Sequence, residues 1–167
     1  MTKKPKHKEY LDITQPINEI AEEINSVLNS RKKEKYFVEI ILLYSFLENL
    51  LKWLVFVKTL WEKVDKELPQ EEVKKLKSFY KKLDFYNALN VALSIGLVDF
   101  NLYKRIDAIR QERNNMIHQF WIYSQRNNLL VLRKKLEKLA RVTNQLVGTF
   151  NQLTKKVGVE EVYEIFL

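Results

Sequence analysis

Arginine, asparagine and histidine side chains near the middle of the sequence have the chemistry to act on a phosphodiester. Arg113, Asn114 and His118 lie close together, and Glu48 lies in an apolar stretch far upstream. Histidine titrates near pH 6.5, which suits proton transfer at neutral pH. The planar guanidinium of arginine binds two phosphate oxygens at once. These residue types point to chemistry on a phosphate group that needs no metal ion.

RNA is a suitable substrate for such a set because its 2′-hydroxyl is the nucleophile. His118 would transfer protons and Arg113 would stabilise the charge that develops on the phosphate, so these two are the candidate catalytic residues. Asn114 would orient His118 or bind a phosphate oxygen, and Glu48 would hold Arg113 in place. Further candidate RNA contacts are Arg110, Lys52 and Tyr123.

Arg113 lies on an apolar stripe of its helix, where an unpaired charge is costly. At about 100° per residue, the stripe contains Leu102, Ile106, Ile109, Met116 and Phe120. We therefore expect Glu48 to pair with Arg113. The alternative is that Glu48 forms an ordinary pair with Lys52, one helical turn away on a solvated strip.

The elements that must position these residues are helices. Apolar residues recur at helical spacing, and nothing alternates as a strand would. Asp84 and Asp99 are expected to cap helices, Pro16 to open one and Gly96 to end one. The expected helices cover residues 16–30, 36–66, 70–83, 85–95, 99–123 and 128–157. The sequence thus predicts an all-α, up-and-down helical bundle of four to six helices.

Composition predicts one globular domain over residues 13–158, with a flexible basic tail at 1–12 and a C-terminal tail at 159–167. The 167 residues include no cysteine and 2 histidines, so we expect no metal site and no cofactor. The net charge of +8 suits a polyanionic partner. No export signal is evident, and charges within 36–61 disfavour a membrane span, so we expect a cytoplasmic protein without membrane contact.

The segment 109–118, IRQERNNMIH, resembles the signature of the HEPN superfamily, in which an arginine precedes a histidine with four to six residues between them (R-x4-6-H). In that family an asparagine often follows the arginine, as Asn114 does here. The segments 87–98, NALNVALSIGLV, and 46–52, FLENLLK, are similar to the family's lead-in and to its long second helix. The resemblance covers about residues 36–123 and agrees with the helical bundle.

The resemblance implies a function and partners. Many HEPN proteins are metal-independent endoribonucleases of toxin–antitoxin, abortive-infection and CRISPR defence systems, and they commonly form homodimers in which two motifs line one cleft. Some are controlled by an antitoxin, in one branch a nucleotidyltransferase that modifies a tyrosine two residues after the histidine. Here Phe120 occupies that position, and Tyr123 follows one turn later. Other HEPN proteins are non-catalytic interaction or nucleotide-binding modules, and a plain helical scaffold is a third interpretation.

Overall fold

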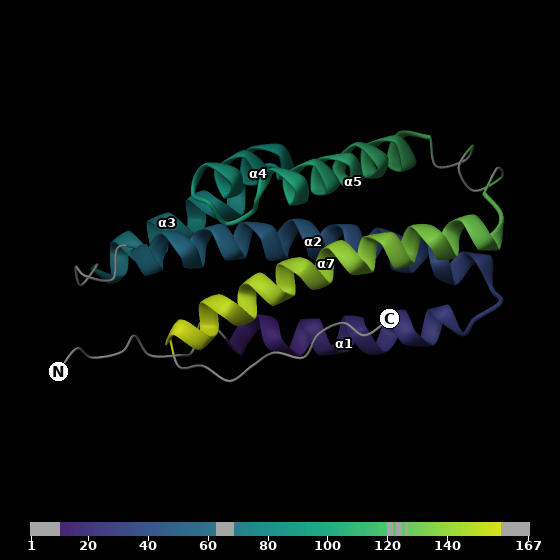
Figure 1. Ribbon diagram of the computed structural model, residues 1–167, viewed down its shortest axis with the longest axis horizontal. Helices are drawn as coiled ribbons and strands as arrows, with labels where there is room; N and C mark the ends of the chain where they lie inside the picture. The colour runs from purple at the N-terminus through teal and green to yellow at the C-terminus, as the bar shows by residue number, and fades with distance from the viewer. Residues whose placement is uncertain (1–10, 63–68, 120–121, 123–124, 126, 158–167) are drawn as a thin grey trace. The chain divides into compact units, whose positions relative to one another are not determined.

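Most of the described residues are helical and none of them forms a strand, which confirms the all-α class. The computed structural model describes residues 11–62, 69–119, 122, 125 and 127–157. Figure 1 shows the helices α1 (Leu11–Leu28), α2 (Lys33–Glu62), α3 (Gln70–Lys82), α4 (Phe85–Ser94), α5 (Phe100–His118) and α7 (Leu129–Val157). The chain is thus a helical bundle.

Short-range capping contacts fix where the helices around the candidate site begin and end. The Asp84 carboxylate accepts a hydrogen bond from the backbone N–H of Asn87 at 2.8 Å and starts α4. Asp99 likewise accepts from the N–H of Leu102 at 2.7 Å and starts α5. After α4, Gly96 has a φ of 66°, a conformation that glycine adopts without a steric penalty. The predicted caps and the predicted stop are confirmed.

Three predicted helix ends are wrong. The second helix begins at Lys33 and not at Tyr36. The first helix begins at Leu11, so Pro16 lies inside α1 instead of at its first position. A proline there removes one helical hydrogen bond, which the rest of the helix tolerates. The fifth helix ends at His118 and not near Tyr123, because Gln119 leaves helical geometry while its N–H still bonds to the Asn115 carbonyl.

The chain divides into two compact units, and α2 contributes to both. Unit 1 consists of Met1–Leu43 and Trp121–Leu167. Within it, α1 runs opposite to the first part of α2 and to α7 (Figure 1). An apolar seam of α7 is buried at Leu132, Leu136, Leu139, Leu146, Phe150 and Leu153. Thr143, its one polar member, is also buried, and its hydroxyl donates to the Leu139 carbonyl at 3.0 Å.

Unit 2 is the continuous segment Tyr44–Phe120 and contains most of the candidate site. In it, α4 and α5 pack against each other. The hydroxyls of Thr59 on α2 and Tyr80 on α3 are 2.9 Å apart, and the Phe56 ring lies 6.1 Å from the Tyr80 ring. The core of this unit includes Leu47, Leu50, Leu51, Leu54, Phe85, Leu89, Ile106, Ile109 and Met116. Glu48 and Arg113 of the candidate site therefore lie on α2 and α5 of one unit.

The predicted domain and its location relative to a membrane stay predictions. Residues 1–10 and 158–167, which include most of the predicted tails, lie outside the described residues. The sequence predicts a single domain over 13–158, and the chain divides into two compact units. Lys33–Thr59 of α2 is long and apolar enough to cross a membrane, and more than half of its most apolar window is buried inside the structure. Such burial is typical of the core helix of a globular bundle.

Candidate functional site

Helix α2 presents two charged side chains on a helix that is otherwise largely apolar in unit 2. Its leucines at positions 47, 50 and 51 are buried. Glu48 and Lys52 are half-buried. The two charged residues are one turn apart, so they share one side of the helix. The Lys52 Nζ atom contacts Glu48 Oε1 at 2.6 Å. The Glu48–Lys52 pair that the sequence offered as an alternative is therefore present.

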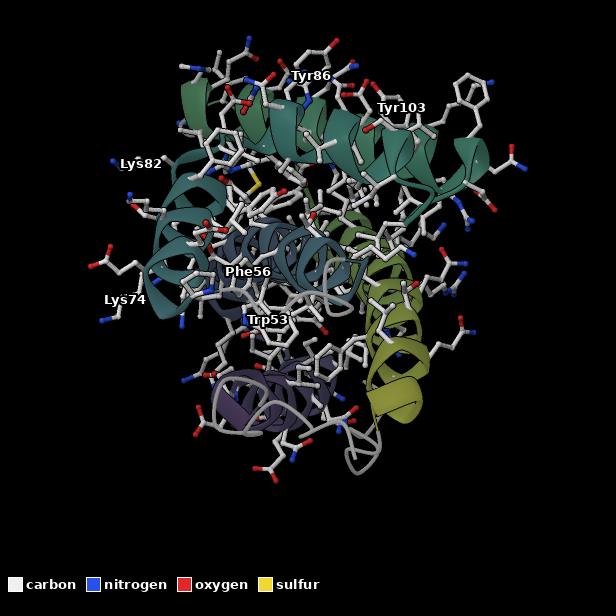
Figure 2. The ribbon with its side chains drawn as sticks, turned by 90° about the vertical axis from the view of Figure 1, so that its left-hand side faces the viewer. Trp53, Phe56, Lys74, Lys82, Tyr86 and Tyr103 are labelled. Carbon is white, nitrogen blue, oxygen red and sulfur yellow. The ribbon has the colours of Figure 1, made fainter. Side chains whose placement is uncertain are left out.

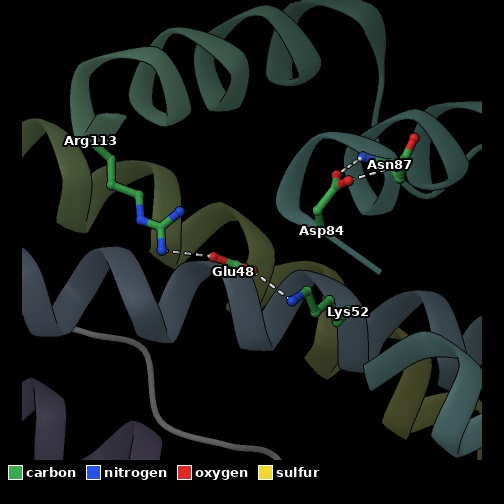
Figure 3. A network of polar contacts seen from close by, with 5 residues as sticks. All are labelled: Glu48, Lys52, Asp84, Asn87 and Arg113. Carbon is green, nitrogen blue, oxygen red and sulfur yellow. Dashed lines mark hydrogen bonds and ion pairs between the residues drawn. The ribbon is translucent and has the colours of Figure 1, made fainter. Parts of the chain in front are cut away.

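Helix α5 brings Arg113 to the same carboxylate. Ile109 and Met116 of α5 are buried and Arg113 is half-buried, as expected for a charge on the core-facing stripe. The Arg113 Nη2 atom lies 3.3 Å from Glu48 Oε2. The predicted pairing of Arg113 with Glu48 is confirmed. Figure 3 shows the arginine extending from α5 to the glutamate on α2.

Glu48 is shared between two cations, one on each of its carboxylate oxygens. Lys52 contacts Oε1 and Arg113 contacts Oε2 (Figure 3). Both pairs that were weighed from the sequence are thus present, but Glu48 and Lys52 are half-buried and do not lie on a solvated strip. Two positive charges around one negative charge leave the group with a net charge of about +1, which favours binding of a further anion. A guanidinium has five N–H donors, so Arg113 has donors beyond this ion pair.

His118 is the last residue of α5 and is exposed to solvent, and Asn114 lies one turn before it, half-buried. Within the part of the chain that the structure describes, no hydrogen bond joins these two side chains, so the expected orienting role of Asn114 stays a prediction. Arg113 and His118 are five residues apart, which separates their directions around the helix axis by about 140°. Arg113 extends to α2, and His118 points to a different side of α5.

The candidate RNA contacts are dispersed. Lys52 belongs to the charged group around Glu48. Arg110 lies elsewhere on α5, where its Nε atom contacts Asp107 Oδ1 at 2.8 Å and its guanidinium lies 5.0 Å from the centre of the Tyr86 ring. Tyr123 lies outside the described residues, as does Phe120.

Sequence reasoning missed the surface on α4 and α5 that surrounds Arg110. The Tyr103 hydroxyl donates to Asn90 Oδ1 at 2.9 Å, which links α5 to α4. Desolvation raises the pKa of the Tyr103 hydroxyl, and the neighbouring Tyr86 and Asp107 raise it further. The signal in the sequence was the recurrence of Phe100, Tyr103 and Arg110 on one side of the predicted helix.

A buried carboxylate in unit 1 was also not recognised as unusual. Glu39 on α2 is only 2% exposed. Burial raises the pKa of its carboxyl from 4.5 to about 7, and the negative charge of Glu23 on α1 raises it as well. A carboxylate away from water prefers its neutral form. The sequence placed Glu39 in an apolar segment, which was the available sign.

Among the residues that the structure describes, no group of three or more histidine, cysteine, aspartate or glutamate side chains is placed to hold a metal ion. In comparisons with known proteins, no family model, no curated protein and no solved structure matches the chain.

Proposed function

We propose that this protein is a HEPN-type endoribonuclease that cleaves RNA without a metal ion. The observation that supports it best is the Glu48–Arg113 ion pair, which fixes the arginine of the R-x4-6-H motif on the same helix as an exposed His118. The arginine is half-buried and anchored, whereas the histidine is accessible to a substrate. A fixed arginine suits phosphate binding, and an accessible histidine suits proton transfer to and from the substrate.

The reaction that these groups would perform is an internal transesterification. A base removes the proton from the 2′-hydroxyl, and the 2′-oxygen attacks the phosphorus. The bond to the 5′-oxygen breaks, and an acid gives that oxygen a proton. The products are a 2′,3′-cyclic phosphate and a 5′-hydroxyl. Arg113 would bind the phosphate oxygens and stabilise their growing negative charge, and His118 would act as base or acid.

A homodimer would complete the site. In one protomer, Arg113 and His118 point in directions about 140° apart, so they do not converge easily on one phosphate. A second copy would bring its own pair to the same cleft and supply the missing acid or base. The net positive charge around Glu48 would then face a substrate from two sides. RNA is the proposed substrate, and an antitoxin or a nucleotidyltransferase is the proposed controlling partner, in the cytoplasm.

One observation favours a second candidate function. Glu48 engages Arg113 and Lys52 together in a half-buried setting, which is also how an ion pair fixes the register of two helices. The protein would then be a HEPN-fold interaction or nucleotide-binding module without turnover, and His118 would be an ordinary surface histidine.

A cleavage assay with excess EDTA tests the proposed function. We expect the wild-type protein to cleave a mixed-sequence RNA and to leave 2′,3′-cyclic phosphate ends. His118→Ala should lower the rate by roughly 10²–10⁴-fold, the usual contribution of a general acid or base. Arg113→Ala should also lose activity, with its fold checked by circular dichroism.

Arg105→Ala is the matched control, because Arg105 is an exposed arginine on the same helix. It should cleave like the wild type. Retained cleavage in His118→Ala would contradict the catalytic assignment. A folded, dimeric wild type that cleaves nothing would favour the non-catalytic module.

A further inference from the structure

Aromatic side chains lie exposed on the outer side of α4 and α5. Tyr86 is 48% exposed and Phe100 is 58% exposed. Tyr103 lies beside them and is partly covered. Figure 2 shows Tyr86 and Tyr103 at the same edge of the molecule. Single exposed aromatic residues are ordinary, but a cluster of them is a typical feature of a binding surface.

Specific contacts hold these rings in place. The rings of Phe100 and Tyr103 are nearly parallel, with centres 6.2 Å apart and an angle of 11° between their planes. The Tyr103 hydroxyl donates to Asn90 Oδ1 on α4, and the Tyr86 ring lies 5.0 Å from the Arg110 guanidinium. The rings are therefore ordered in advance, which reduces the entropy that a ligand must overcome on binding.

Positive charges lie over the same rings. The Lys104 Nζ atom is 4.5 Å from the centre of the Phe100 ring. The Arg110 guanidinium is 5.0 Å from the centre of the Tyr86 ring, and Asp107 holds it there. These are distances at which a cation and a π face attract each other. Each exposed ring thus has a cation beside it.

We propose that this surface, the aromatic strip formed by Tyr86, Phe100, Tyr103, Lys104 and Arg110, binds single-stranded RNA. Unstacked bases would pack on the rings, and phosphates would contact the two cations, a combination typical of single-strand binding. In a duplex the bases are already stacked on each other and do not reach such rings. The choice of RNA rests on the proposed function, and the net charge of +8 complements its backbone.

The aromatic strip continues along α5 towards the candidate catalytic histidine. At about 100° per residue, Tyr103, Arg110, Asn114 and His118 lie within about 80° of one another around the helix axis. Tyr103 and His118 are separated by about 22 Å along that axis. A strand bound to the strip would therefore be guided to His118, and the strip would hold nucleotides on one side of the bond to be cut.

The test measures binding separately from cleavage. The probe is a fluorescent, mixed-sequence 2′-O-methyl RNA of about 12 nucleotides, a length within the usual range of single-strand sites, which cannot be cleaved because its 2′-oxygen is blocked. We expect the variant Tyr86→Leu/Phe100→Leu to bind it roughly 10- to 100-fold more weakly than the wild type, as measured by fluorescence anisotropy. The wild type should prefer this strand to the same sequence in a duplex.

Phe79→Leu is the matched control, because Phe79 is an aromatic residue on α3 that is 57% exposed, as Phe100 is 58% exposed. It should bind like the wild type. The proposal would be overturned if the double variant bound the single strand as tightly as the wild type does. It would also be overturned if the wild type bound the duplex as tightly as the single strand. If the double variant does not fold, Lys104→Gln/Arg110→Gln provides the same test. Loss of both cations should lower the affinity for the strand and make that affinity less dependent on salt concentration.

Cleavage of unmodified RNA, measured in parallel, separates the two proposals. If the wild type cleaves RNA but its binding does not depend on the aromatic strip, the binding proposal is overturned and the nuclease proposal stands. If the wild type binds RNA through the aromatic strip but does not cleave it, the binding proposal stands and the nuclease proposal is overturned.

Discussion

Replacing Glu39 by glutamine should stabilise the protein at alkaline pH. Glu39 is buried in unit 1, and its pKa is raised from 4.5 to about 7 by desolvation and by the charge of Glu23. One pKa unit corresponds to about 1.36 kcal/mol. Full ionisation of the buried group therefore costs the folded state on the order of 3 kcal/mol. Glutamine keeps the shape of the protonated acid and never ionises.

The sign and the pH window follow from the raised pKa. Below pH 4.5 the carboxyl is protonated in the folded and the unfolded chain, and no stability is lost. Between pH 4.5 and about 7, the unfolded chain ionises first, so this group lowers the free energy of unfolding by about 1.4 kcal/mol per pH unit. Above about pH 7 the loss is complete. The stability difference between Glu39→Gln and wild type should grow through that window and then level off.

Urea unfolding followed by circular dichroism at several pH values between about 5 and 8 measures this difference. Glu22→Gln is the control, because Glu22 is an exposed glutamate on α1. Its effect should stay nearly constant with pH. Glu23→Gln should flatten the wild-type pH dependence in part, since it removes the second cause of the shift. A difference between Glu39→Gln and wild type that does not change from pH 5 to pH 8 would refute this reasoning.

The remaining predictions concern contacts in unit 2, each measured by urea unfolding. Glu48→Gln should cost about 1–2 kcal/mol, because Arg113 and Lys52 then face each other as half-buried like charges; an unchanged stability would mean that the pair is fully solvated. Asp99→Ala should cost about 1 kcal/mol through loss of the α5 cap. Gly96→Ala should cost about 1 kcal/mol from its positive φ alone, since an added Cβ meets no atom within 4 Å. A cost well above this would indicate a clash.

The features that were predictable from the sequence depend on neighbours along one helix. Asp84 and Asp99 cap their helices through atoms three residues away, and Gly96 ends α4 by its own conformational freedom. The helix ends that were predicted wrongly have no such capping residue nearby in the sequence. Nothing in the sequence marks the end of α5 at His118, and Pro16 is tolerated inside α1 because the helix is long enough to lose one bond.

The candidate site shows the same division. Periodicity placed Arg113 on the buried side of its helix, and the cost of an unpaired charge then selected Glu48, which the ion pair confirms. Periodicity along one helix could not show that Glu48 binds Lys52 at the same time. The contact of Arg110 with Tyr86 was also beyond reach, because it depends on how α4 packs on α5.

The order of the chain through the two units has a consequence for its synthesis. Unit 2 is continuous, whereas unit 1 joins segments from both ends of the sequence. A ribosome adds roughly 5–20 residues per second, so unit 2 can fold while α7 is still being made. Until then the apolar side chains of α1, such as Ile17 and Ile24, lack the C-terminal part of their own unit. We therefore expect the nascent chain to be most prone to aggregation in this interval, when α1 is exposed.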